Sequence, residues 1–176
     1  MLFSDRSTPI GKAIDAYLKG EAEHEDHVIH LLFSANRWEA AAQMRADIAD
    51  GITLIVDRYY MSGIVYSAAK QNPDLDATWA RQPEVGLPEE DLTVFLSLDP
   101  QVARTRGDFG DEVYERAELQ TIVLGLFEGM LSGMDGSRKA VITANRSVME
   151  VESAIREAVD RMLGSDALEK PLRSVS

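Results

Sequence analysis

The chain has 176 residues, 30 of them acidic and 18 basic, and its formal net charge is −12. This length suits one domain with a core of its own, and the negative charge argues against a surface that binds nucleic acid through its phosphates. The chain contains no cysteine, which excludes a disulfide framework. It also shows neither an apolar run long enough to span a bilayer nor a signal-peptide pattern. We expect a soluble protein without membrane contact, in the cytoplasm or also in the nucleus.

The first third of the chain has the pattern of a loop followed by helices. Met1 to Phe3 resembles the end of a strand, and Ser4 to Gly11 resembles the loop that would follow it. Apolar residues at helical spacing and polar or glycine stops then predict three helices. These helices cover residues 11–18, 25–39 and 40–49.

Strands and helices alternate in the rest of the chain. Apolar, β-branched runs predict strands, and helical periodicity predicts helices between them. The strands cover residues 53–57, 91–99 and 140–144, and the helices cover residues 62–71, 114–131 and 148–163. This alternation is typical of an α/β fold with a parallel sheet covered on both faces.

Three further segments complete a single predicted domain over residues 1–176. Residues 76–88 form a long loop marked by proline and glycine, and such loops are often functional. Residues 104–116 are charged and contain glycines, as expected of a mobile lid. Residues 164–176 form a polar carboxy-terminal tail.

Asp57-Arg58-Tyr59 follows the first predicted strand directly. Open α/β sheets bind ligands at the carboxyl ends of their strands, where a guanidinium can hold two phosphate oxygens and a carboxylate can orient metal-bound water or a sugar hydroxyl. The alternative is a surface turn with an incidental ion pair, since short motifs also occur by accident.

Phe33 and Arg37 lie four residues apart on a predicted helix, so both side chains lie on one face. Such a face can stack an aromatic ring and bind an anion. Phe33 could instead belong to the core, with Arg37 as a solvated surface residue. His24, His27 and His30 do not favour a metal site, because a spacing of three does not keep three rings on one face.

Several of these segments together resemble thymidylate kinase in its eukaryotic form. The resemblance rests on residues 32–39 (LFSANRWE), 53–60 (TLIVDRYY), 62–66 (SGIVY), 68–70 (AAK), 82–88 (QPEVGLP) and 169–172 (EKPL). It implies a three-layer P-loop nucleotide-kinase fold with a parallel sheet. It also implies transfer of the γ-phosphoryl group of ATP to dTMP with Mg²⁺, giving dTDP for dTTP synthesis, in a homodimer.

By the same resemblance, Phe33 stacks on the thymine ring and Arg37 hydrogen-bonds its edge. Arg6 and Arg58 bind the phosphate of dTMP, while Tyr114 and Gln120 line the nucleoside pocket. Asp57, Arg58 and Arg106 are then the expected catalytic residues. Asp57 acts near the sugar, or near the metal through water, and Arg106 binds the donor ATP from the lid. The competing interpretations are an Arg6–Asp5 pair, a solvated Arg106, and helix-starting roles for Tyr114 and Gln120.

The chain departs from the family pattern in three places. Ser4 replaces the usual proline and Val113 replaces the usual arginine of the lid. The phosphate-binding motif Gly-x-x-x-x-Gly-Lys-[Ser/Thr] does not occur in the 176 residues. We therefore expect a fold without its first strand, P-loop and first helix, in which turnover is in doubt. The alternative is a non-catalytic homologue that binds dTMP or pairs with a full-length subunit.

Overall fold

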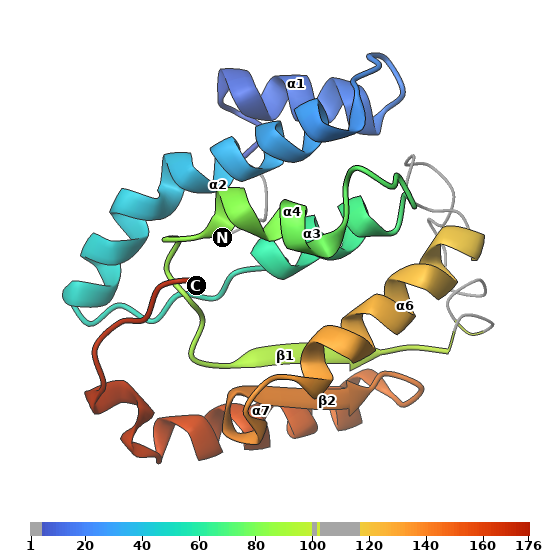
Figure 1. The fold of residues 1–176 in the computed structure, drawn as a ribbon. Coiled ribbons are helices and arrows are strands. Elements are labelled where there is room, and N and C mark those ends of the chain that lie inside the picture. Colours follow the sequence, from blue (N-terminus) through green and yellow to red (C-terminus); the bar gives the residue numbers. More distant parts are fainter. Residues whose placement is uncertain (1–4, 100–101, 103–116) are drawn as a thin grey trace. The chain divides into compact units, whose positions relative to one another are not determined.

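Figure 1 shows the computed structural model, which describes residues 5–99, 102 and 117–176. The chain divides into two compact units. The first comprises Met1–Pro88, Gly110–Phe127 and Ser174–Ser176, and the second comprises Glu89–Phe109 and Glu128–Arg173. Each unit is described separately below.

Helices dominate the described part of the first unit. They are α1 (Pro9–Leu18), α2 (Asp26–Ala49), α3 (Tyr60–Ala68), α4 (Ala77–Arg81) and the short 3₁₀ helix η1 (Gln82–Glu84). Helix α6 (Ala117–Ser132) begins in this unit and ends in the second.

Helix α2 is one continuous helix of 24 residues, where the sequence predicted two. The predicted break after Glu39 was wrong because the following residues, Ala40 to Ala42, are the strongest helix formers and no glycine or proline interrupts them. Glu25 is the N-cap residue of the helix, and its carboxylate accepts hydrogen bonds from the backbone N–H groups of His27 and Val28.

The core between α1 and α2 consists of Ile14, Leu18, Ile29 and Phe33. α1 lies along α2 in Figure 1. Helix α1 starts from Thr8, whose hydroxyl accepts a hydrogen bond from the Gly11 N–H at 3.0 Å, with Pro9 in the first turn. The predicted helix over residues 11–18 is thus confirmed and begins two residues earlier.

The strand predicted over residues 53–57 is not formed. Residues 52–56 have no regular secondary structure, and Asp57 makes an isolated bridge. The side chain of Ile55 is 82% exposed, so this apolar run is not buried on both sides. An apolar run encodes the capacity to form a strand, whereas a strand also needs a hydrogen-bonded ladder that local sequence does not specify.

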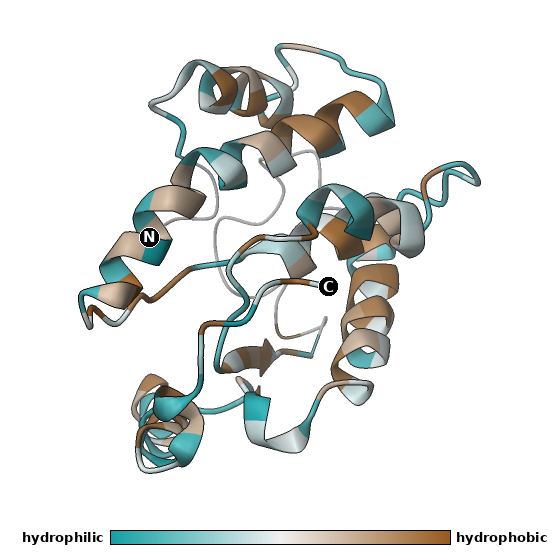
Figure 2. Ribbon diagram, turned by 60° about the vertical axis from the view of Figure 1, so that its left-hand side comes forward, coloured by the Kyte–Doolittle hydropathy of each residue, from teal (hydrophilic) through white to brown (hydrophobic). Residues whose placement is uncertain are grey.

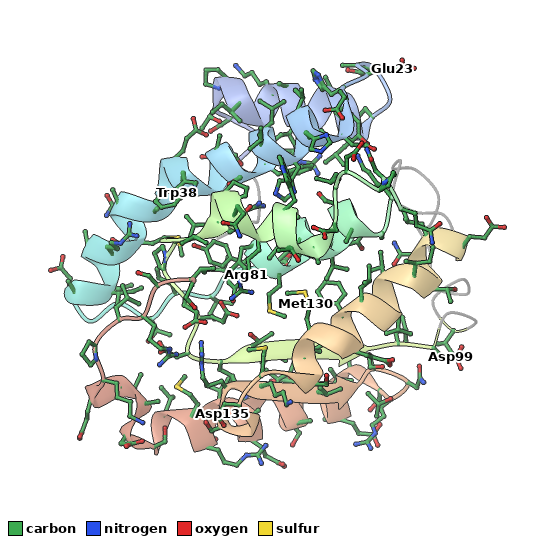
Figure 3. The ribbon with its side chains drawn as sticks, viewed as in Figure 1. Glu23, Trp38, Arg81, Asp99, Met130 and Asp135 are labelled. Atoms are coloured by element: carbon green, nitrogen blue, oxygen red, sulfur yellow. The ribbon has the colours of Figure 1, made fainter. Side chains whose placement is uncertain are left out.

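The predicted loop over residues 76–88 contains α4 and η1 and is tied to the carboxy-terminal residues. Gly86 N–H donates to the Val175 carbonyl at 2.8 Å, and Val175 N–H donates to the Leu87 carbonyl at 2.9 Å. The side chain of Val175 is 2% exposed. Arg81, labelled in Figure 3, donates from Nε to the carbonyl of Ser176 at 2.7 Å. The end of the predicted polar tail is therefore packed into the first unit.

The second unit contains two parallel strands, β1 (Thr93–Ser97) and β2 (Lys139–Thr143). Thr93 pairs with Lys139 and Ser97 with Thr143, in continuous register. The two strands lie side by side in Figure 1. Both strands and the parallel arrangement agree with the sequence prediction. The described sheet has the order β1-β2, so the larger three-layer arrangement stays a prediction.

Helix α7 (Val148–Leu163) is confirmed with the predicted bounds. Ser147 and Glu150 form a reciprocal capping box at its start, which explains why the sequence located this end so well. Figure 2 shows α7 alternating between polar and apolar residues, whereas α6 is mostly apolar. The short helices η2 (Gly136–Arg138) and η3 (Asp166–Glu169) complete the unit.

Among the helices that the structure describes, none combines the length and apolar character needed to cross a membrane.

Candidate functional site

The loop that carries Arg6 is anchored on α2. Asn36 donates from Nδ2 to the Asp5 carbonyl at 3.3 Å and to Thr8 Oγ1 at 3.2 Å. Thr8 in turn donates to Glu39 Oε2 at 2.9 Å. These bonds fix residues 5–8 beside the helix segment that also carries Phe33 and Arg37.

Arg6 itself is largely exposed and pairs with Asp15 of α1 at 2.6 Å. The predicted alternative, a pair with Asp5, is wrong, because Asp5 accepts hydrogen bonds from the backbone and hydroxyl of Ser7 instead. These bonds hold the pKa of Asp5 below its usual value. The surface pair with Asp15 is weak enough for a phosphate to compete for the guanidinium.

Phe33 packs against Ile14, Leu18 and Ile29, and 8% of its surface is exposed. The core interpretation of this residue is therefore confirmed. Packing between α1 and α2 therefore covers most of the Phe33 ring.

Arg37 is buried, where the alternative interpretation predicted a solvated residue. Its Nε donates to Glu84 Oε2 at 2.8 Å, and its Nη2 donates to Glu84 Oε1, so the two side chains form a two-pronged ion pair. Glu84 lies in η1 and is fully buried. Sequence reasoning missed Glu84, since a single acidic residue in a proline-rich loop usually faces solvent.

Arg58 lies over an aromatic ring of α3. Its Cζ is 5.5 Å from the centroid of the Tyr66 ring, a cation–π geometry. Gln120 of α6 donates from Nε2 to the Tyr66 hydroxyl at 3.4 Å. Two predicted site residues thus meet at Tyr66, which the sequence analysis did not single out as a site residue. Tyr66 lies in the segment Ser62–Tyr66 that matches the family, and this match was the one sign in the sequence that Tyr66 belongs to the site.

Arg58 also has an unusual backbone, with φ of +60°. This left-handed conformation is uncommon outside glycine, asparagine and aspartate and costs free energy. Such strain often occurs at functional sites, because the surrounding structure must hold the residue in place.

Helix α3 links the two arginines. Gly63 and Tyr66 are three residues apart and share one face of the helix. The Arg37 guanidinium lies against Gly63, where an added Cβ would be 2.7 Å from Nη2, while Arg58 lies against Tyr66. The structure therefore brings Arg37, Arg58 and Gln120 to one face of α3.

A buried histidine lies beside the Arg37–Glu84 pair. His30 Nδ1 is 2.7 Å from the Ser67 hydroxyl, and its Nε2 is 3.8 Å from Glu84 Oε1. Burial, and secondarily the positive charge of Arg37, lower the pKa of His30 to about 4. The ring is therefore neutral at physiological pH.

Asp57 is exposed at the end of the extended segment, next to Arg58. Among residues 5–99, 102 and 117–176, no cluster of three or more histidine, aspartate or glutamate side chains could hold a metal ion. Arg106 and Tyr114 lie outside the described residues, as do Ser4, Val113 and the whole of the predicted lid, residues 104–116.

Several known proteins that are similar to this chain are thymidylate kinases. A family model for thymidylate kinase matches residues 1–155. The chain is 42% identical to thymidylate kinase of Danio rerio over 172 residues, covering 98% of this chain and 79% of the relative. It is 44% identical to that of Schizosaccharomyces pombe over 162 residues, covering 91% and 76%.

The human thymidylate kinase is 41% identical over 170 residues, covering 92% of this chain and 79% of the relative. Among solved structures, thymidylate kinase from Candida albicans superposes with a TM-score of 0.86 at 31% identity, covering 99% of this chain and 84% of that chain. The chain therefore belongs to the thymidylate kinase family of nucleoside monophosphate kinases.

Proposed function

We propose that the chain binds dTMP on the α3 face that carries Arg37 and Arg58. Arg37 hydrogen-bonds the edge of thymine, and the exposed part of the Phe33 ring contacts the base. Arg58 and Arg6 bind the phosphate. The observation that carries the proposal is the meeting of Arg37, Arg58 and Gln120 on Gly63 and Tyr66.

The chemistry of these side chains suits a nucleoside monophosphate. A guanidinium binds phosphate oxygens in pairs, and the strained backbone of Arg58 fixes the direction from which it does so. Gln120 can donate and accept hydrogen bonds and so suits a pyrimidine or sugar. Tyr114 is proposed to line the same pocket.

The proposed reaction transfers the γ-phosphoryl group of ATP to dTMP. A phosphate oxygen of dTMP forms the new bond to phosphorus, the bond to the β-phosphate oxygen breaks, and ADP and dTDP result. Members of this family use ATP, generally with Mg²⁺. Bound Mg²⁺ neutralises developing charge on the phosphates, and it commonly needs only one or two protein carboxylates. Asp57 fits such a role through water, and Arg106 is proposed to contact ATP.

A non-catalytic homologue is the second candidate. The observation that favours it is the lack of Gly-x-x-x-x-Gly-Lys-[Ser/Thr] in the 176 residues. That motif supplies the backbone N–H groups, the lysine and the hydroxyl that hold the donor phosphates in P-loop enzymes. Such a homologue would bind dTMP, or pair with a full-length subunit, without turnover.

The proposed homodimer is supported by α2. Val28, Leu31 and Trp38 recur at helical spacing and stay exposed, and Trp38 is labelled on this helix in Figure 3. An exposed apolar stripe of this kind suits a second copy of the same helix. Sedimentation velocity of Leu31→Glu against the unchanged chain tests this, with a shift from dimer to monomer expected.

Calorimetric titration with dTMP, followed by an assay of dTDP formation with ATP and Mg²⁺, tests the proposed function. We expect binding that Arg58→Ala weakens and that Arg156→Ala, on the exposed surface of α7, leaves unchanged. Turnover that disappears on chelation by EDTA supports the kinase, and binding without turnover supports the homologue. Absence of dTMP binding at millimolar concentration contradicts the proposed dTMP site and leaves only a homologue that pairs with a full-length subunit.

A further inference from the structure

The two-pronged contact between Arg37 and Glu84 fixes the plane of a guanidinium inside the protein. Both side chains are buried almost completely. Two parallel N–H···O bonds restrain the plane and its direction, which a single bond would not. This two-pronged ion pair uses two of the five N–H donors of the Arg37 guanidinium.

The Glu84 carboxylate is in turn held in place by hydrogen bonds to its neighbours along the chain. The Pro83 carbonyl, next to Glu84, accepts hydrogen bonds from Ser34 Oγ at 3.0 Å and from Trp38 Nε1 at 2.8 Å. Arg45 of α2 donates to the Gly86 carbonyl. Residues on both sides of Glu84 are therefore fastened to the helix that carries Arg37.

The guanidinium also lies close to the backbone of α3. An added Cβ at Gly63 would lie 2.7 Å from Nη2 and 3.0 Å from Nη1 of Arg37, so the backbone of α3 lies directly against it. His30 also lies beside Glu84, with its Nε2 3.8 Å from Oε1. Glu84 and Gly63 together restrain the orientation of the guanidinium.

We infer that Glu84 is a positioning residue, which holds Arg37 in the orientation that distinguishes the edge of thymine from that of cytosine. The inference rests on the proposed binding of dTMP. Thymine presents a carbonyl oxygen at C4 and cytosine an amino group, so a fixed guanidinium N–H donates to the first and faces another donor in the second. A mobile guanidinium would lose this discrimination while keeping its charge.

Calorimetric affinities for dTMP and dCMP, compared between the unchanged chain and Glu84→Gln, test the inference. Glutamine keeps the shape of the side chain, but its amide group places an N–H where one of the two Glu84 oxygens accepts a hydrogen bond from Arg37. We expect the ratio of the two affinities to fall by about tenfold. Glu152→Gln, which removes one partner of the exposed Arg156 pair on α7, is the matched control and leaves the ratio unchanged.

The ratio of the dTMP and dCMP affinities distinguishes a positioning role of Glu84 from a merely structural role. Loss of stability alone would lower both affinities by the same factor and leave the ratio unchanged. Measurements are made where circular dichroism shows each variant to be folded. Glu84→Asp, which keeps the charge but is shorter by one methylene, takes the place of Glu84→Gln if that variant does not fold. A folded variant with an unchanged ratio overturns the inference alone, whereas an unchanged chain that does not bind dTMP overturns the proposed function as well.

Discussion

Gly63 of α3 lies so close to Arg37 of α2 that a Cβ added to the glycine would be 2.7 Å from Nη2. Any side chain at position 63 must therefore displace the guanidinium, and the bond to Glu84 opposes that displacement. The Arg37 guanidinium thus holds α2 and α3 at a fixed separation. Because we propose that Arg37 also contacts dTMP, we expect stability and ligand binding to be coupled at this contact.

Gly63→Ala is expected to destabilise the chain by about 1–3 kcal/mol through overpacking, in spite of the better helix propensity of alanine. It should also weaken dTMP binding. Urea unfolding and calorimetric titration measure the two effects. Gly125→Ala in α6 is the control: a Cβ there meets nothing within 4 Å, so a gain of about 0.5–1 kcal/mol is expected. A stabilising Gly63→Ala would contradict the close approach.

Removal of Arg37 leaves the buried carboxylate of Glu84 without its ion-pair partner. We expect Arg37→Met to lower the free energy of unfolding by about 3–5 kcal/mol, and the further change Glu84→Leu to restore most of it. The exposed pair of Arg156 with Glu152, at 2.9 Å, provides the control. Arg156→Met should cost less than about 1 kcal/mol in the same urea titration. Equal losses at the two sites would show that the buried pair is solvated.

Tyr66 is expected to support Arg58 through its ring. Tyr66→Leu removes the cation–π contact and should weaken dTMP binding by about threefold. Tyr17→Leu is a matched control, because the ammonium of Lys70 lies 5.2 Å from the Tyr17 ring in an equivalent contact. Titration of both folded variants with dTMP decides the matter: a larger loss in Tyr17→Leu would remove Tyr66 from the site.

His30 makes stability depend on pH. Its pKa is about 4 in the folded chain and 6.5 as the ordinary value. The unfolded chain therefore takes up a proton as the pH falls below 6.5 while the folded chain does not, and stability is lost until the pH reaches about 4. The full loss amounts to about 3 kcal/mol. Urea midpoints between pH 7 and 4 should fall less in His30→Gln than in the unchanged chain.

His27 provides a contrast of opposite sign. Hydrogen bonds from its ring to Glu25 and to the Asp74 carbonyl raise its pKa above the usual value. Its contribution to stability is thus complete below pH 6.5 and is lost as the pH rises through the folded-state pKa. His27→Gln should lower stability most at acidic pH. If His27→Gln and His30→Gln changed the pH profile in the same direction, the assignment of one ring would be wrong.

Val175 tests the packing of the carboxy-terminal residues. Its side chain is buried beside Leu87, so Val175→Ala should cost about 1–3 kcal/mol. Proteolytic cleavage within residues 82–88 should also become faster, because the paired segment loosens. Val148→Ala, at a position 83% exposed, should change stability by less than about 0.5 kcal/mol. Unchanged cleavage in Val175→Ala would show that the pairing does not protect the loop.

The sequence by itself predicted the elements whose signals are local. The capping box of Ser147 and Glu150 and the period of α7 lie within a few turns, and they located that helix at both ends. Apolar β-branched runs predicted β1 and β2, and the alternation of strands with helices predicted their parallel arrangement. The spacing of Phe33 and Arg37 placed them on one face of α2, and matched motifs indicated the family.

The tertiary structure decided which of these groups are buried and which partners they meet. The Glu84 partner of Arg37 lies 47 residues away, Tyr66 joins Arg58 to Gln120, and residues 53–57 do not form the predicted strand. Local periodicity records which face of an element is apolar, but burial of a charge depends on the desolvation and counter-charge that distant segments supply. Only the folded chain brings these together.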